Sequence, residues 1–420
     1  MTGGAGGGPG GAPATGGTIT ATGGTRSTGG ATGGAGTVRD AGLGGTGGST
    51  ALRDAAVATG GTTNGTGGSS AAGGTAATGG ALGTGGIVTG GTKSTGGTTA
   101  TGGSATGGAT GTDGCPTNLV GWAMVEGDGL KTTTGGGSAA PQRVTALADF
   151  KSLAGDSTAR VIEISGTIDT GTSAVDIASN KTIIGVNQSA TIKGGINIRE
   201  GTSNIIVRNL NIVGKGEGND PADTVAARGS HHLWFDHLNI SDGGDGNLDL
   251  TKGCNYLTVS WTKFSYTDPN HTHRLSCLIG SGSTEAATDT GRNNVTYHHN
   301  WFAELVDQRM PRVLFGQGHV FNSYYTSSGN GYCVGTGSFA SVLVEGNYFK
   351  NVKSPHRFQD TNPSYITARD NVYDNTTGNQ DTGLGGSGGT VTPFTDPPYD
   401  YALDKTANIP DLITRCAGPR

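Results

Sequence analysis

Three aspartates in one short glycine-rich segment are the first residues that could do chemistry. Asp242, Asp245 and Asp249 lie within residues 241–250, whose sequence is SDGGDGNLDL. If this segment is extended, Asp245 and Asp249 project from the same face, because side chains alternate along a strand. Two carboxylates on one face are typical of a hard-cation site or of a paired acid and base. Since Asp and Gly also mark turns, a turn is the alternative interpretation.

Other charged residues could act together with these aspartates. Asp223 lies roughly one repeat earlier in the chain and would add a third carboxylate from an adjacent strand. Three carboxylates with few charged neighbours favour Ca²⁺ over mutual repulsion. Arg309 and Arg312 stand in the segment RMPR, and arginine presents a planar fork to carboxylates. A Ca²⁺ site and arginines that face one groove would suit a polymer that carries carboxylates. The alternative for both arginines is a role in structural ion pairs.

The histidines and cysteines are expected to have structural roles. His298, His299 and His319 stand at predicted strand positions, where a hydrogen-bonded side chain is more common than a metal ligand. The five cysteines are an odd number, so at least one thiol stays unpaired in a monomer. Cys115 and Cys416 bracket the second part of the chain and are the first candidates for a disulfide.

The elements that must position these residues recur at a near-constant interval. Apolar residues that end N-x-apolar and related phrases are 28, 24, 38, 23, 24 and 24 positions apart; they are Ile212, Ile240, Phe264, Phe302, Tyr325, Phe349 and Tyr373. Such a period indicates a repeat architecture. The sequence lacks the L-x-x-L-x-L pattern of leucine-rich repeats and the amphipathic helices of helical repeats. A parallel β-helix with one coil per repeat is therefore predicted. A β-sandwich with coincidental spacing is the alternative.

Runs rich in β-branched and aromatic residues predict the strands of these coils. They are residues 161–164, 181–184, 203–207, 233–235, 256–259, 294–297, 341–344 and 365–368. A short amphipathic helix is predicted within residues 144–155, and the 38-residue interval predicts a long loop over residues 265–292. Asparagines one or two residues before the apolar anchors are expected to form a ladder of stacked amides; these are Asn211, Asn239, Asn300, Asn347 and Asn371.

The first 112 residues differ in composition from the rest of the chain. They contain 42 of the 81 glycines and none of the Phe, Trp, Tyr, His or Cys. Because Gly, Thr, Ser and Ala bury too little apolar surface to offset the entropy of ordering, residues 1–112 are predicted to be a disordered linker. Residues 113–420 are predicted to be a single domain. The first residues lack the basic and apolar regions of a signal peptide, and further residues upstream are expected.

Charge and hydropathy limit the expected partners. The net charge is −5, and residues 113–420 carry 23 basic and 30 acidic residues. This balance argues against nucleic acid as a partner, since binding to phosphates needs an excess of Lys and Arg. No run of about 20 apolar residues is present, so no membrane-spanning helix is predicted.

Several ordered motifs between residue 115 and the C-terminus resemble those of pectate lyase family 1, a family of polysaccharide lyases. They are LWFDH (233–237), DGNLDL (245–250), LIG (278–280), YHHN (297–300) and RMPRVLFG (309–316). The resemblance implies an all-β fold, a right-handed parallel β-helix, that cleaves polygalacturonate (pectate) by Ca²⁺-dependent β-elimination. It implies Ca²⁺ ligands at Asp223, Asp245 and Asp249 and the catalytic arginine at Arg309. Asp236 and His237 in LWFDH are interpreted as mainly structural.

The resemblance also implies substrate-binding residues, and here the sequence departs from the family. Arg312 matches a basic position and is expected to bind substrate. The usual lysine three residues before Leu278 is Leu275 here, and Arg274 is the better of its neighbours for binding a carboxylate. The family's second arginine, five residues after the catalytic one, is Leu314 here.

These observations predict a secreted, monomeric Ca²⁺-dependent pectate lyase that yields unsaturated oligogalacturonides. Related pectin lyases lack the acidic triad, so the acidic polymer is the favoured substrate. The departures at Leu275 and Leu314 leave three alternatives open: a pectin lyase, a non-catalytic pectin-binding β-helix, or a β-helical hydrolase that uses paired carboxylates. The family assigns Arg309 the role of base, which requires loss of a guanidinium proton; stabilising a carbanion-like intermediate is its other possible role.

Overall fold

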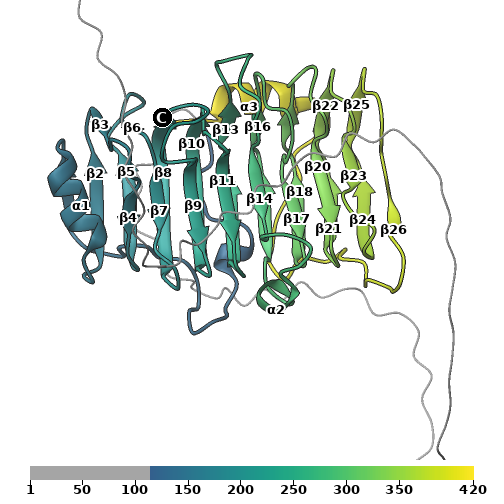
Figure 1. Ribbon diagram of the computed structural model, residues 1–420, viewed down its shortest axis with the longest axis horizontal. Coiled ribbons are helices and arrows are strands. Elements are labelled where there is room, and N and C mark those ends of the chain that lie inside the picture. Colours follow the sequence, from purple (N-terminus) through teal and green to yellow (C-terminus); the bar gives the residue numbers. More distant parts are fainter. Residues whose placement is uncertain (1–113) are drawn as a thin grey trace, which may run out of the picture. The chain divides into compact units, whose positions relative to one another are not determined.

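The computed structural model of the protein describes residues 114–420, and the predicted linker, residues 1–112, lies outside them. The described chain folds as stacked coils built from two sheets (Figure 1). Strand pairing between successive coils is parallel, and the last strand of the larger sheet pairs antiparallel with its neighbour. The predicted parallel β-helix is therefore confirmed.

The smaller sheet has eight strands, and the predicted site residues lie on it or in the turns that lead into it. Its strands in spatial order are β4 (Val175–Ile177), β7 (Ile196–Ile198), β9 (Asp223–Arg228), β11 (Gly246–Thr251), β14 (Cys277–Ile279), β17 (Arg312–Leu314), β20 (Val334–Gly337) and β23 (His356–Phe358). The spatial order follows the chain order, so each coil contributes one strand.

The larger sheet has eighteen strands. They are β1 (Pro141–Val144), β2 (Arg160–Ile164), β3 (Thr167–Asp169), β5 (Lys181–Gly185), β6 (Thr191–Lys193), β8 (Ser203–Val213), β10 (His231–Ser241), β12 (Asn255–Ser260), β13 (Lys263–Ser265), β15 (Val295–His298), β16 (Trp301–Phe302), β18 (Gln317–Phe321), β19 (Tyr324–Tyr325), β21 (Ser341–Glu345), β22 (Tyr348–Lys350), β24 (Ser364–Arg369), β25 (Val372–Asp374) and β26 (Gly383–Gly385). All eight strands predicted from composition lie in this sheet.

A bend with left-handed backbone divides each coil of the larger sheet. β10 pairs with β12 through residues 231–236 and with β13 through residues 239–241, and His237 between them has a φ of 49°. The same corner recurs in neighbouring coils, with positive φ at Asn209, Trp261, His299, Asn322, Gly346 and Asp370. These positions follow the intervals of the predicted repeat, so the sequence period corresponds to one complete coil.

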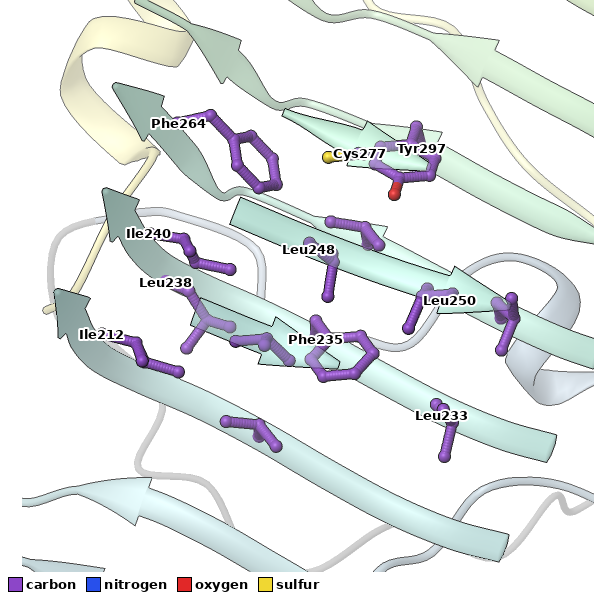
Figure 2. Close-up of a cluster of buried hydrophobic side chains, with 14 of the residues drawn as sticks. Ile212, Leu233, Phe235, Leu238, Ile240, Leu248, Leu250, Phe264, Cys277 and Tyr297 are labelled. Atoms are coloured by element: carbon purple, nitrogen blue, oxygen red, sulfur yellow. The ribbon is translucent and has the colours of Figure 1, made fainter. Parts of the chain in front are cut away.

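The predicted apolar anchors stack directly on one another in the core. Ile212, Ile240 and Phe264 are register partners in consecutive coils. From Phe264 the column becomes aromatic: consecutive ring centroids through Phe302, Tyr325, Phe349 and Tyr373 are 5.2, 4.9, 4.4 and 5.6 Å apart. Figure 2 shows the aliphatic end of this column, where Ile212, Ile240 and Phe264 lie across from Leu248 and Cys277 of the smaller sheet.

The amide ladder forms only in part. Asn239 donates to the side-chain oxygen of Asn211 at 3.2 Å, and Asn347 donates to that of Asn371 at 3.0 Å. Asn300 bonds instead to the backbone of the preceding coil, at Val259 O and Thr262 N. The ladder breaks there because the neighbouring coils carry Thr262 and Ser323 at the equivalent positions.

The interval of 38 residues is not one loop, as predicted, but two loops separated by a strand. β14 lies inside residues 265–292 and pairs with β11 and β17. The second loop contains the short helix α2 (Ala286–Asp289). Leu278 of β14 faces outward and only Cys277 and Ile279 are fully buried, so this strand has little apolar pattern by which a sequence could reveal it.

One helix lies at an end of the stack, and the other helices and the end segments pack on its outside (Figure 1). The predicted amphipathic helix is α1 (Leu147–Gly155), which lies at one end beside β2 (Figure 1). The short 3₁₀ helices are η1 (Trp122–Met124) and η2 (Thr406–Asn408), and α3 (Ile409–Cys416) is the last helix. The predicted disulfide is confirmed, since Cys115 and Cys416 are bonded, while Cys254, Cys277 and Cys333 are buried thiols. Within residues 114–420 no helix is long and apolar enough to cross a membrane.

Candidate active site

The parallel topology collects the predicted site residues along one edge of the eight-stranded sheet. The chain enters each strand of this sheet from the same side, so the entry ends of β9, β11, β14 and β17 lie next to one another. Asp223 begins β9, Asp245 directly precedes β11, and Arg312 begins β17. Arg274 and Arg309 each lie three residues before a strand, β14 and β17 respectively.

Asp223 and Asp249 come closest to one another across the bare backbone of Gly246. Gly246 is the register partner of Asp223. A Cβ atom on Gly246 would lie 3.1 Å from Oδ1 of Asp249 and 3.4 Å from Oδ1 of Asp223. Both Oδ1 atoms are buried, and neither has a hydrogen-bond partner in residues 114–420. Two carboxylate oxygens without partners therefore border a space that a side chain at residue 246 would occupy.

The electrostatics of this pair favour a bound proton or a cation. Burial, together with the charges of Asp249 and Asp245, raises the pKa of Asp223 to about 8. Burial also raises the pKa of Asp249 to about 6, although the positive charge of Arg309 opposes the increase. Carboxylates that are held without partners and resist ionisation are suitable ligands for a hard divalent cation, which would supply the missing positive charge.

The other predicted acidic residues are less closely involved. Asp245 is exposed and contributes through its charge, which raises the pKa of both Asp223 and Asp249. Within residues 114–420 no set of three or more His, Cys, Asp or Glu side chains gathers as a metal site. Oδ1 of Asp242 is used within the fold, because it accepts hydrogen bonds from the amide and hydroxyl of Thr267 in the next coil.

Arg309 is held by its backbone and leaves its guanidinium free. Its carbonyl accepts a hydrogen bond of 2.7 Å from Cys277 N, and Met310 N donates to Cys333 O at 2.8 Å. Its φ of 62° is uncommon for a residue with a side chain, and such strain is often found at functional sites. Across the described chain the guanidinium has neither an ion pair nor a hydrogen bond, but its charge acts on Asp223 and Asp249.

Arg312 lies on the same outward-facing row as Asp249. The register runs from Asp249 to Leu278 to Arg312 across β11, β14 and β17. Two strand spacings separate the arginine from the aspartate, roughly 10 Å. Nε of Arg312 is buried without a hydrogen-bond partner in residues 114–420, and no ion pair engages this side chain there. The structural ion pairs considered for Arg309 and Arg312 are therefore not formed within this part of the chain.

Arg274 lies in a loop that is held in place by Glu217, a residue that was not predicted from the sequence. Nη1 of Arg274 donates to Pro269 O at 3.2 Å, and its carbonyl accepts from Asp307 N. Thr272 of the same loop donates hydrogen bonds from its hydroxyl and its amide to Glu217, and these bonds lower the pKa of Glu217 to about 2. Glu217 is in the loop before β9, so no local sequence pattern could indicate that it meets Thr272.

The two residues that depart from the family pattern are both buried. Leu275 is 9% exposed, and its carbonyl accepts a 2.7 Å hydrogen bond from the Tyr266 hydroxyl. Leu314 is completely buried, and a Cβ on Gly280, at the start of the loop that carries α2, would lie 3.0 Å from its Cβ. An arginine at residue 314 would thus be covered by this loop, which agrees with the leucine found there.

The residues interpreted as structural are held by internal hydrogen bonds. Asp236 is fully buried and accepts from Arg208 at 2.9 Å and from the Ser260 hydroxyl at 2.7 Å. His299 contacts Asp404 at 2.9 Å. Nε2 of His319 contacts Glu345 at 2.8 Å. These contacts use the groups that a metal or substrate would need, and they support the structural interpretation.

Comparison with known proteins agrees with this geometry. A family model described as pectate lyase matches residues 55–418. Pectate lyase A of Aspergillus niger is 32% identical over 306 residues, which cover 71% of this chain and 86% of that protein. A pectate trisaccharide-lyase of Thermotoga sp. RQ2 is 39% identical over 159 residues, 36% of this chain and 41% of that protein.

A solved structure has the same fold. The pectate lyase of Bacillus sp. N165 in complex with trigalacturonate matches with a TM-score of 0.59 and 23% identity, covering 72% of this chain and 99% of that chain. The family model and the curated relative from Aspergillus niger cover most of the described residues. The chain therefore belongs to the pectate lyase family of polysaccharide lyases.

Proposed function

We propose that this protein is a Ca²⁺-dependent pectate lyase that cleaves polygalacturonate by β-elimination and releases unsaturated oligogalacturonides. The observation that carries the proposal is the pair of buried, unpartnered Asp223 and Asp249 oxygens beside the unpaired guanidinium of Arg309. Asp223 and Asp249 would hold the cation, and the exposed Asp245 would complete its oxygen ligands. A bound Ca²⁺ would withdraw charge from a uronate carboxylate and acidify the adjacent C5–H.

The side chains of the protein have separate tasks in this mechanism. Arg309 faces C5 of the sugar, where it takes the proton or stabilises the negative charge that loss of the proton leaves. The electron pair then forms the C4–C5 double bond, and the C4–O bond breaks with its electrons on the oxygen of the neighbouring sugar, which takes a proton from water. Arg312 and Arg274 bind carboxylates of the chain and hold the sugar in this orientation. Because a long charged polysaccharide does not cross a membrane, the proposal includes action outside the cell, and it takes the protein to act as a monomer.

An assay with and without a chelator tests the proposal. The protein is incubated with polygalacturonate in Ca²⁺ or in EDTA, and products are followed by ultraviolet absorbance and by reducing-end analysis. Unsaturated ends that form only with Ca²⁺ are expected. Reducing ends without unsaturation would identify a hydrolase instead, and binding without cleavage would identify a carbohydrate-binding β-helix. Cleavage restricted to methyl-esterified chains would identify a pectin lyase. The Arg309→Ala variant serves as the matched inactive control and should lose at least about a hundredfold in kcat.

A further inference from the structure

The edge of the eight-stranded sheet that carries the candidate site continues past it for two more coils. Met310 N donates to Cys333 O, Cys333 N to Ser354 O, and Ser354 N to Thr377 O, at 2.7 to 3.0 Å. The turns before β20 and β23 therefore lie in line with the turn that carries Arg309. Figure 1 shows β17, β20 and β23 side by side in this order.

Basic side chains without ion pairs lie along this continuation. Arg357 is the register partner of Gly335, which is in turn the partner of Arg312, so Arg357 extends the outward row that begins at Asp249. Its guanidinium stands over the ring of Tyr332, 5.6 Å from the centroid. Lys353, four residues earlier, is exposed. Neither side chain forms an ion pair with any residue of the described 114–420 segment.

Between the two arginines, the side chains of Tyr332 and Gln359 cover the backbone of Gly335. A Cβ on Gly335 would lie 2.8 Å from the Tyr332 ring and 2.7 Å from Nε2 of Gln359, so the glycine leaves room for both side chains. The Tyr332 ring is 4% exposed and lies beneath the guanidinium of Arg357. The buried ring therefore supports Arg357, whose guanidinium can bind the carboxylate of a sugar.

A polar hollow lies among the turns that lead into β20 and β23. It measures about 510 Å³ and is lined by Lys353 and by the side chains of consecutive turns, including Asn351 and Asn375. Nδ2 of Asn375 donates to Oδ1 of Asn351 at 2.8 Å, so the remaining donor of Asn351 and the acceptor of Asn375 are available to sugar hydroxyls. The hollow thus combines neutral hydrogen-bonding groups with one ammonium group.

We infer that Arg357 and Lys353 form a distal subsite that binds galacturonate residues of a polymer extending from the Asp223–Asp249 pair past Arg309 and Arg312. The inference rests on the proposed function for the identity of the sugar. Four strand spacings, roughly 19 Å, separate Asp249 from Arg357, so only a chain of several sugars reaches both. The subsite explains how this chain binds an anionic polymer although Leu275 and Leu314 replace two basic residues of its family.

Charge-removing variants test the subsite. Arg357→Gln and Lys353→Gln are compared with Lys350→Gln, which removes a charge from the exposed Lys350 at the end of β22 in the other sheet. Each subsite variant should raise KM for polygalacturonate by about five- to tenfold with kcat within about twofold, since a charge-assisted hydrogen bond is lost. KM for trigalacturonate bound at the catalytic residues should not change, and Lys350→Gln should match the wild type. An unchanged KM for the polymer, or an equal increase for the trimer, would overturn the inference.

Binding without turnover separates the inference from the proposed function. Retardation of the proteins in gels that contain polygalacturonate and EDTA reports binding alone. If the wild type is retarded in EDTA but cleaves nothing in the separate Ca²⁺ assay, the proposed reaction is wrong, and weaker retardation of Arg357→Gln and Lys353→Gln still supports the subsite. If the wild type is not retarded in EDTA and does not cleave the polymer in Ca²⁺, the subsite itself is disproved.

Discussion

At the scale of single residues, the decisive feature is that Asp223 and Asp249 each keep one buried oxygen that has no hydrogen-bond partner among residues 114–420. Each carboxylate loses hydration and gains no compensating hydrogen bond at that atom, which disfavours its charged form. Such an arrangement costs stability in the protein alone and is compensated only when a proton or a cation is bound. At the candidate site, the arrangement that would bind a cation therefore lowers the stability of the cation-free protein.

Stability should depend on pH in a direction that follows from these pKa values. Between the ordinary carboxyl pKa of 3.8 and the raised values of about 6 and about 8, the folded state binds more protons than the unfolded chain. The pair's contribution to the free energy of unfolding therefore falls as pH rises through this range. We expect Ca²⁺ to raise Tm more at about pH 8 than at about pH 5, because protons compete with the cation. Thermal melts in EDTA and in Ca²⁺ at both pH values check this.

The Asp223→Asn, Asp249→Asn double variant is the control for that experiment. It has no carboxylate pair to titrate, so in EDTA its Tm should exceed that of the wild type at the higher pH. Ca²⁺ should no longer raise its Tm. An equal Ca²⁺-dependent gain at both pH values, or in the double variant, would contradict the assignment of the pair.

Gly246→Ala tests the space between the two carboxylates. The added methyl group would lie 3.1 and 3.4 Å from their Oδ1 atoms and would displace them. We expect about tenfold more Ca²⁺ to be needed for half-maximal activity, with Tm in EDTA little changed, because one lost ligand contact is worth on the order of 1.4 kcal/mol. Gly282→Ala is the matched control, since its methyl group would meet nothing within 4 Å. Identical Ca²⁺ titrations for both variants would show that the cation lies elsewhere.

At the scale of elements, the two sheets differ in how clearly the sequence indicates them. The predicted strands all belong to the eighteen-stranded sheet, whose members, such as β10 and β21, are longer, contain several large apolar residues and are buried on both faces. Strands of the smaller sheet, such as β14 and β17, have three residues each. Three residues with one outward side chain carry almost no periodicity. The sheet that bears the site was thus visible only through its motifs.

The aromatic column should dominate the stability of these coils. Phe302 lies between Phe264 and Tyr325, with ring centroids at 5.2 and 4.9 Å, and is fully buried. Phe302→Ala should lower the free energy of unfolding by about 3–5 kcal/mol, because it leaves a cavity that rigid neighbouring coils cannot fill. Leu384→Ala, at a position that is 49% exposed, is the control and should change it by less than about 0.5 kcal/mol. Denaturant titrations of both variants measure the difference.

At the scale of the whole molecule, the two ends of the described chain pack together on the larger sheet. Trp122 stacks on Phe394 with ring centroids 6.1 Å apart, and its backbone N donates to Thr296 at 3.0 Å. The Tyr399 hydroxyl lies 2.6 Å from the same Thr296 hydroxyl. The disulfide between Cys115 and Cys416 joins these segments across 301 positions. Segments from both ends of the described chain thus cover the outer face of the larger sheet together.

Removing this disulfide should loosen the ends without removing the site. The free energy of unfolding of the Cys115→Ser, Cys416→Ser variant should be lower than that of the wild type by about 2–5 kcal/mol, since a crosslink constrains the unfolded chain. Its kcat in Ca²⁺ at low temperature should stay within about twofold of the wild type, because the entry edge of the smaller sheet is built by other coils. Cys333→Ser, at a buried thiol without a disulfide, controls for the loss of sulfur. Equal stability of the double variant and the wild type would contradict this role.

The sequence by itself determined the repeat and therefore the fold class. Anchors from Ile212 to Tyr373 are spaced by one coil, and each became the register partner of the next, because a parallel β-helix repeats its geometry with its period. The parity of Asp245 and Asp249 made Asp249 a candidate, and the segment RMPR and its family resemblance made Arg309 one. The positions of Cys115 and Cys416 at the two ends of the domain suggested the disulfide that forms.

Only the tertiary structure decided which of these residues meet and which stay without partners. Asp223 and Asp249 are 26 positions apart and approach because Gly246 opposes Asp223 in the register. Glu217 holds the loop of Arg274 from 55 positions away, and Arg357 joins the row of Arg312 through Gly335. Burial of the aspartate oxygens and of Leu314 depends on atoms contributed by several coils. Distances and dielectric surroundings of this kind arise from packing between coils, and a local sequence pattern carries no record of them.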